Sequence, residues 1–430
     1  MHVCRRWRNV VFASPRGLNL QLFCTHKTPT RETLDNWPVL PIIVFANARV
    51  VVPNVVTRES LMEGADNIIA ALEHNERVFR ITFKDVPSLL WERSIALMQA
   101  PFPALTYLEL WSVNEIDETA LVLPESFLGG CVPGLQSLEL GGIRFPALRK
   151  LLLSANDLVN LDLWDIPNSG YISPKAMVTS LSTLTKLETL HLGFRSPLSR
   201  PDQTGHRLPP LTRILLPVLT SLWFRGVSEY LEDLVSQIDA PLLDDVIITF
   251  FNQLVFDTPQ LLRFVSRTES LKGFTQANVV FDDQSVEVTL SPQIGTIERT
   301  KITLGISCMN LDWQLSFLVQ VMNSFLSSLS TLEHLNILGG HPPHWQDDVE
   351  NTQWLELLHP FAAVKDLYLT NETALRFASA LQEFSGEEET EILPALRSLF
   401  LLWQSEPVPA AIWRFVAARQ LSGHPIAIHR

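Results

Sequence analysis

The sequence has few cysteines, and no pattern that would pair them. Its 430 residues include Cys4, Cys24, Cys131 and Cys308, and no two of them form a C-x-x-C pair. Scattered single cysteines argue against a disulfide framework and against a structural zinc site, which needs closely spaced ligands. We therefore expect free thiols.

The sequence also has no apolar run that would make a membrane-spanning helix. Its longest apolar region, residues 37–56, is interrupted by three prolines, by Arg49 and by two asparagines. A spanning helix of about 20 apolar residues does not accommodate these interruptions. The N-terminus is rich in arginine around Trp7 and has no apolar stretch typical of a signal peptide. We expect a cytoplasmic or nuclear protein that does not bind membranes.

Basic residues are in the minority. Lysine and arginine number 33 against 46 aspartates and glutamates, which gives a formal net charge of −13. This charge disfavours nonspecific attraction to nucleic acid or to an anionic membrane. A hydrophobic content of 46% with 18% charged residues indicates a folded chain rather than an extended disordered one. The expected partners are proteins, and nucleic acid is not expected.

Motifs that would indicate catalysis, a metal or a nucleotide are not found. The histidines of the segment 341–344 are separated by two prolines, which disfavour a helix that would aim both imidazoles at one metal. Each Asp-Asp pair occupies positions i and i+1, which point to opposite faces of a strand. Neither Gly-Gly pair is followed by the Gly or Lys of a phosphate loop, and G-x-S-x-G is missing. We predict no catalytic, metal or cofactor site, and therefore not an enzyme.

The phrase L-x-x-L-x-L recurs along the chain. Clear copies begin at Leu105, Leu135, Leu148, Leu158, Leu187, Leu332, Val364 and Leu396, and looser copies begin at Val78, Leu219 and Leu243. The copies at 332, 364 and 396 are 32 residues apart, whereas those at 135, 148 and 158 are only 13 and 10 apart. Several copies follow a proline by two residues. An ordinary α/β domain with Leu-rich strands is the alternative, but it would not repeat these offsets.

Each phrase predicts a short strand, because its last residues alternate with a period of two. Helical spacing over residues 60–72, 173–184, 311–329 and 373–384 predicts helices that precede strands, and residues 279–290 predict a hairpin. One strand cannot bury its apolar face alone, but stacked repeats can. The predicted fold is an α/β leucine-rich-repeat solenoid, or horseshoe, with irregular repeats.

The candidate binding surface consists of the side chains that point away from the predicted core. These are positions i+2 and i+4 of each phrase, together with residues two positions further along the strand. The predicted substrate-binding residues are Tyr107, Glu109, Trp111, Glu139, Asp162, Trp164, His191, Trp223, Tyr368 and Phe400. Early repeats supply acidic groups and late repeats supply aromatic ones. This gradient favours a protein partner with a basic end and an apolar end.

Residues 3–16, VCRRWRNVVFASPR, resemble the C-terminal half of an F-box, in which V-C-R-x-W-R precedes a short helix, a Ser/Thr-Pro-Arg turn and an apolar strand. With the repeats that follow, the chain looks like the F-box/leucine-rich-repeat proteins that are abundant in fungi. The resemblance implies a partial F-box-like segment at residues 1–20 and an irregular repeat domain at 21–430. It implies that Val3, Trp7 and Val11 on an N-terminal helix dock the adaptor subunit of a cullin–RING ubiquitin ligase, while the repeats present a substrate protein.

The Leu-Pro segment that begins the family's F-box is not in this sequence, so the F-box is expected to be truncated at its N-terminus. Two functions are therefore considered. In the first, the protein is a substrate receptor of an SCF-type ubiquitin ligase. In the second, it is a leucine-rich-repeat scaffold that binds proteins without the adaptor, and the N-terminal helix only packs on the first repeat.

Overall fold

A computed structural model gives the fold, and its described residues form two compact units. Unit 1 comprises residues 1–199 and 212–219, and unit 2 comprises residues 200–211 and 220–430. The structure describes residues 6, 20–24, 29–36, 40–47, 58–84, 86, 88–112, 121–197, 212–251, 256, 258–292, 300–308, 311–325, 331–339, 351–383, 392–402 and 408–429.

In the described residues of unit 1, seven strands pair in sequence order and run parallel. They are β1 (Leu20–Phe23), β2 (Ile42–Asn47), β3 (Val78–Lys84), β4 (Tyr107–Trp111), β5 (Ser137–Gly141), β6 (Asn160–Ile166) and β7 (Thr189–Phe194). Parallel strands need a crossover between them, and short helices or loops provide it here. The unit also holds the two-residue strand β8 (Ile214–Leu215).

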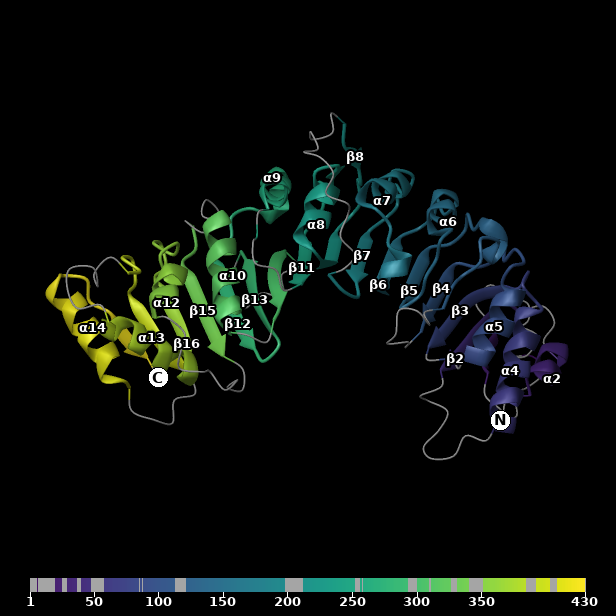
Figure 1. Ribbon diagram of the computed structural model, residues 1–430, viewed down its shortest axis with the longest axis horizontal. Helices are drawn as coiled ribbons and strands as arrows, with labels where there is room; N and C mark the ends of the chain where they lie inside the picture. The colour runs from purple at the N-terminus through teal and green to yellow at the C-terminus, as the bar shows by residue number, and fades with distance from the viewer. Residues whose placement is uncertain are drawn as a thin grey trace. The chain divides into compact units, whose positions relative to one another are not determined.

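The helical segments of unit 1 are α2 (Thr30–Asn36), α4 (Arg58–Leu72), α5 (Ser88–Leu97), η3 (Phe127–Gly130), α6 (Leu148–Ser154), η4 (Asn168–Gly170) and α7 (Pro174–Leu181). Helices α6 and α7 lie next to each other beside the strands (Figure 1). Helix α7 begins where the sequence predicted, because Pro174 occupies its first turn and the Ser173 hydroxyl accepts a hydrogen bond from the Ala176 N–H.

Unit 2 repeats the strand–helix alternation with one insertion. Its strands pair in the order β9-β11-β14-β13-β12-β15-β16-β17-β18. Their bounds are β9 (Ser221–Gly226), β11 (Asp245–Phe251), β12 (Gln276–Asp282), β13 (Ser285–Ser291), β14 (Lys301–Ser307), β15 (His334–Gly339), β16 (Asp366–Thr370), β17 (Ser398–Leu402) and β18 (Ala427–His429), and β10 (Ile238–Asp239) is a two-residue strand. The predicted hairpin is confirmed as β12 and β13, which are antiparallel.

The helical segments of unit 2 are α8 (Ser228–Val235), α9 (Pro259–Arg267), η5 (Glu269–Leu271), α10 (Leu311–Ser324), α12 (Asn351–Leu358), α13 (Asn371–Glu383) and α14 (Ala410–Leu421). Neighbouring helices contact one another from α10 through α12 and α13 to α14. Each of these helices precedes a strand along the chain, as the sequence predicted for α10, α12 and α13, whereas α14 and β18 were not predicted. The mixed α/β class and the parallel sheet are therefore confirmed, and they are consistent with a repeat solenoid.

The core lies between the strands and the helices, and it is built from the apolar positions of the repeated phrase. Leu108, Leu138, Leu161 and Leu190 occupy the same phrase position on β4 to β7, are register partners, and are completely buried. Alternate residues on the same strands point to the opposite face of the sheet. The repeated phrase thus forms both a leucine core and a second, polar surface.

One of the predicted strands is wrong. The phrase Leu148-Leu151-Leu153 forms helix α6, which connects β5 to β6. Leu148, Leu151 and Leu152 are buried, whereas Leu153 is 40% exposed. Leucines at i, i+3 and i+4 also make one face of a helix, so this phrase fits either structure. Leu152 is position i+4 of this phrase, which was predicted to belong to the binding surface. It belongs instead to the core between helices and sheet.

This difference can be tested by a pair of leucine substitutions. Leu151→Ala should lower the free energy of unfolding by about 2–5 kcal/mol, because Leu151 is 1% exposed. Leu153→Ala should change it by less than about 0.5 kcal/mol, because the side chain already contacts water. The measurement is urea unfolding followed by circular dichroism. A larger loss from Leu153→Ala than from Leu151→Ala would instead support the strand interpretation.

Candidate functional site

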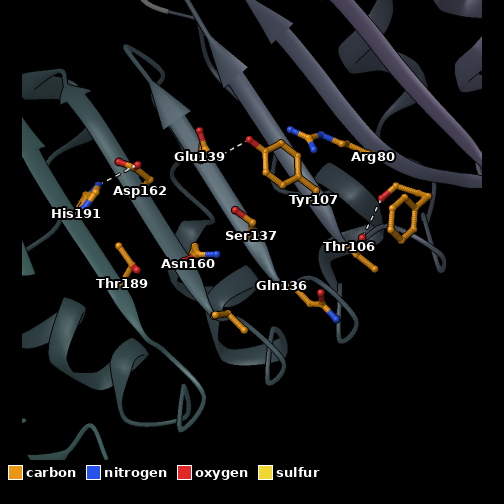
Figure 2. Close-up of a pocket in the computed structure, with 12 residues that line it drawn as sticks. Arg80, Thr106, Tyr107, Gln136, Ser137, Glu139, Asn160, Asp162, Thr189 and His191 are labelled. Carbon is orange, nitrogen blue, oxygen red and sulfur yellow. Dashed lines mark hydrogen bonds and ion pairs between the residues drawn. The ribbon is translucent and has the colours of Figure 1, made fainter. Parts of the chain in front are cut away.

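A pocket of about 560 Å³ lies on the polar face of the sheet in unit 1, across strands β3 to β7 (Figure 2). Its walls come from residues that precede each strand and from the outward positions near the strand's start. The lining residues are Phe79, Arg80, Thr106, Tyr107, Gln136, Ser137, Glu139, Val159, Asn160, Asp162, Thr189 and His191.

The register of the strands arranges these side chains in rows. Residues at the same phrase position are partners on neighbouring strands, so each position forms a line across the sheet. The first row is Arg80, Tyr107, Ser137, Asn160 and Thr189, and the second is Thr82, Glu109, Glu139, Asp162 and His191. The second row brings three carboxylates and one imidazole onto four consecutive strands.

Tyr107 joins the two rows. Its hydroxyl lies 2.6 Å from Glu139 Oε1 and 3.1 Å from Glu109 Oε2. The Arg80 guanidinium lies 3.6 Å above the centre of the Tyr107 ring, in a cation–π contact. Lys84 Nζ makes an ion pair of 2.5 Å with Glu109 Oε1. Figure 2 shows the Tyr107 hydroxyl directed toward Glu139, with Arg80 on the other side of the ring.

These surroundings raise the pKa of two groups, Tyr107 and Glu139. Burial raises the pKa of Tyr107 most, and the hydrogen bond to Glu139 and the two carboxylate charges raise it further. Tyr107 is therefore a hydrogen-bond donor at neutral pH. Burial is also the largest cause that raises the pKa of Glu139, and the charges of Glu109 and Asp162 add to it. The hydrogen bond from Tyr107 and the charge of Lys84 act in the opposite direction.

At the other end of the row, His191 and Asp162 form a pair across β6 and β7. His191 Nδ1 lies 3.0 Å from Asp162 Oδ2, and the Trp164 ring meets the imidazole edge to face, with centroids 5.8 Å apart. The Asp162 side chain is 18% exposed. Its second oxygen, Oδ1, is buried and has no hydrogen-bond donor among the described residues. The row therefore ends in a fixed imidazole beside a partly satisfied carboxylate.

Two tryptophans border the carboxylate row, and a glycine makes room for them. Gly141 is the register partner of both Trp111 and Trp164. A Cβ at Gly141 would lie 2.5 Å from the Trp111 ring, so a larger residue would displace that ring. The two indole centroids approach to 6.4 Å across the gap. The result is an aromatic patch directly beside the acidic row.

The structure brings together seven of the sequence-predicted surface residues: Tyr107, Glu109, Trp111, Glu139, Asp162, Trp164 and His191. Glu109 differs from the expectation of an accessible position, because it is only 4% exposed. Lys84 and Tyr107 cover and bind its carboxylate, so it supports Tyr107 rather than presenting itself to a partner. The predicted adaptor-binding residues Val3, Trp7 and Val11 lie outside the described residues.

The other three predicted residues belong to unit 2. Trp223 lies on β9, while Tyr368 and Phe400 are register partners on β16 and β17. The rings of Tyr368 and Phe400 stack at 4.3 Å with an angle of 7°, and His429 on β18 continues the stack at 4.5 Å from Phe400. Burial, and to a lesser extent the charge of Asp366, raises the pKa of Tyr368.

Sequence analysis missed several residues of the pocket, above all Arg80. Its signal was present, since Arg80 is the i+2 residue of the looser phrase that begins at Val78. Lys84, which binds Glu109 beside the pocket, lies further along the same strand and was also missed. In unit 2, His429 had no such signal, because β18 does not carry the repeated phrase. Gln136 and Thr106 were missed because they precede their strands and reach the pocket from its edge.

No protein-family model and no curated protein matches the chain. Among solved structures, the leucine-rich repeat-containing protein LegL7 from Legionella pneumophila is similar at 12% identity, with 94% of this chain and 98% of that chain covered and a TM-score of 0.25. The strand order and the register define the fold.

Two further features of the described residues concern the kind of site. No cluster of three or more His, Cys, Asp or Glu side chains in that part of the chain is arranged to hold a metal ion. None of the helices there combines the length and the apolar character that a membrane span requires. Cys24 and Cys308 are buried and Cys131 is exposed, none of these three forms a disulfide, and burial raises the pKa of Cys24 to about 12.

The raised pKa of Glu139 leads to a pH-dependent prediction. The folded state holds the Glu139 proton more tightly than the unfolded state, so this group's contribution to stability falls as pH rises from the ordinary carboxyl pKa through the raised value. Glu139→Gln removes the charge and keeps an acceptor for Tyr107. The variant should therefore be more stable than the wild type at pH 7, and the difference should vanish near about pH 4.

Urea unfolding at both pH values checks this prediction. Glu333→Gln is the matched control with the opposite sign, because Lys365, 2.6 Å away, lowers the pKa of Glu333. That variant should be less stable than the wild type at pH 7. If the stability of Glu139→Gln relative to the wild type instead falls as pH rises from 4 to 7, the surroundings of Glu139 do not raise its pKa.

Proposed function

We propose that this chain is a protein-interaction scaffold without catalytic activity of its own, and that the sheet-face pocket of unit 1 contacts a partner protein. The observation that carries the proposal is the pocket itself, where aromatic rings lie beside charged and hydrogen-bonding groups on one sheet. Tyrosine, tryptophan and arginine are the residue types that contribute most to protein interfaces. These side chains lie on or next to paired strands, so little conformational freedom is lost on binding.

The polar contacts in and beside the pocket support recognition rather than chemistry. Lys84 binds Glu109, Tyr107 binds Glu139, and His191 binds Asp162. Each pair fixes the position of a charged or aromatic group at the surface. A fixed arrangement of this kind favours specificity, because a partner with the wrong charges leaves groups unpaired.

Steric blocking of the pocket tests this proposal. Asn160→Trp places a large ring in the pocket wall, and Asn156→Trp places the same ring on an exposed turn outside the lining residues. We expect proteins captured by the tagged wild-type chain to be lost with Asn160→Trp and kept with Asn156→Trp. Quantitative mass spectrometry identifies them, and binding is then repeated with the purified partner. Partners that bind both variants equally would show that the pocket is not the contact surface.

We further propose a finer role, that of a substrate receptor of an SCF-type ubiquitin ligase. Its support is the resemblance of residues 3–16 to the C-terminal half of an F-box, followed by leucine-rich repeats. In this role Val3, Trp7 and Val11 contact the adaptor subunit, and the sheet face of unit 1 holds the substrate. The alternative is a scaffold that binds its partner without the adaptor.

Adaptor binding separates the two roles. A receptor should bind the purified adaptor subunit of the ligase, and Trp7→Ala should abolish this binding because it removes the largest apolar side chain of the segment. Trp413→Ala is the control, since Trp413 is 50% exposed on α14 and far along the chain. The readout is calorimetry with equal amounts of folded protein. Lack of binding by the wild-type chain would leave the adaptor-independent scaffold.

A further inference from the structure

The pocket in unit 1 has an imbalance of charge along its second row. Glu109, Glu139 and Asp162 are carboxylates at the same position on three adjacent strands. Among the described residues, two cations contact Glu109 or Tyr107, namely Arg80 and Lys84, and both lie on β3 at one edge of this group. These contacts with lysine and arginine therefore lie at the end of the row away from Asp162.

The two cations are already engaged. Lys84 is committed to Glu109 at 2.5 Å, and the Arg80 guanidinium lies against the Tyr107 ring. The Tyr107 hydroxyl has one hydrogen, so it can donate to Glu139 or to Glu109 but not to both at once. The contacts described for the three carboxylates therefore supply fewer hydrogen-bond donors than the carboxylate oxygens can accept.

Asp162 provides a second observation, a carboxylate oxygen without a hydrogen-bond donor among the residues that the structure describes. One of its oxygens is bound by His191, while the other is buried and has no donor in the described part of the chain. A buried carboxylate oxygen without a donor costs free energy that a nearby positive charge would recover. Both Glu139 and Asp162 line the pocket, so a group placed in the cavity lies next to both carboxylates.

From these observations we infer that the pocket receives an arginine side chain of the partner protein, with its guanidinium beside Glu139 and Asp162. This inference rests on the proposed protein-binding function and names the chemistry of the partner. Glu139 and Asp162 are register partners, and neighbouring strands are about 4.8 Å apart. A guanidinium presents parallel N–H groups on its edges and can bind two such carboxylates, whereas an ammonium group is a single point charge.

The borders of the pocket fit the rest of an arginine-containing segment. The Trp111–Trp164 patch lies two residues beyond the carboxylate row, at about 7 Å along the strands. An apolar residue next to the arginine would contact these rings. The arginine stem itself would lie along the outward side chains of the first row, such as Asn160 and Thr189.

The test uses the full chain and two probes. The first probe is arginine amide at millimolar concentration, compared with citrulline amide, which has nearly the same shape but no charge. Carboxyl chemical shifts of Glu139 and Asp162, observed by carbon-detected NMR, report binding. We expect saturable shifts with arginine amide alone, and affinity about tenfold lower for the double variant Glu139→Gln, Asp162→Asn. Equal shifts with both amides would overturn the inference.

The second probe is a phage-displayed library of random 12-residue peptides panned on the folded chain. Peptides that Asn160→Trp blocks and Asn156→Trp does not should contain arginine, and replacing it by citrulline in the synthetic peptide should abolish binding. Pocket-dependent peptides without arginine, or acidic peptides directed at Arg80, would overturn the arginine assignment and leave the protein-binding proposal standing. Failure to obtain any pocket-dependent peptide, together with no shift by arginine amide, would overturn both.

Discussion

The parallel register of the strands is the constraint on which the surface of this protein depends. When equivalent residues of successive repeats are register partners, one phrase position becomes a line of side chains across the sheet. A slip of one residue in any strand would turn its leucines outward and its polar residues into the core. The complete burial of Leu108, Leu138 and Leu161 therefore fixes where Tyr107, Glu139 and Asp162 point.

This constraint also explains how a group of like charges is tolerated. Backbone hydrogen bonds hold neighbouring strands about 4.8 Å apart, so the residues of the second row stay at this spacing. Lys84, Tyr107 and His191 each satisfy part of the row through direct contacts. Burial makes these contacts stronger than on an open surface, and it makes the remaining unpaired oxygen of Asp162 more costly.

The hairpin in unit 2 shows that apolar residues remain register partners where the strand direction changes. Strand β13 is antiparallel to both β12 and β14, yet Val279, Val288 and Leu304 remain register partners and are all buried. Side chains alternate with a period of two in either direction, so a reversed strand can keep its apolar residues in the core. The departure from the repeated phrase in this segment thus alters the connections and leaves the two faces of the sheet intact.

The sequence by itself determined the positions of β4, β5, β6 and β7, their core leucines, and the outward direction of residues such as Tyr107, Asp162 and His191. Periodicity suffices for these, because alternation within one strand is a local property. Tertiary structure alone decided that Leu148-Leu151-Leu153 is a helix, since its spacing suits both a strand and a helix and packing against the sheet selects one. It also decided that Glu109 is covered while Glu139 lines a pocket, although both occupy the same phrase position. That difference depends on Lys84 and Arg80, which come from another repeat and meet Glu109 and Tyr107 only when β3 and β4 are paired.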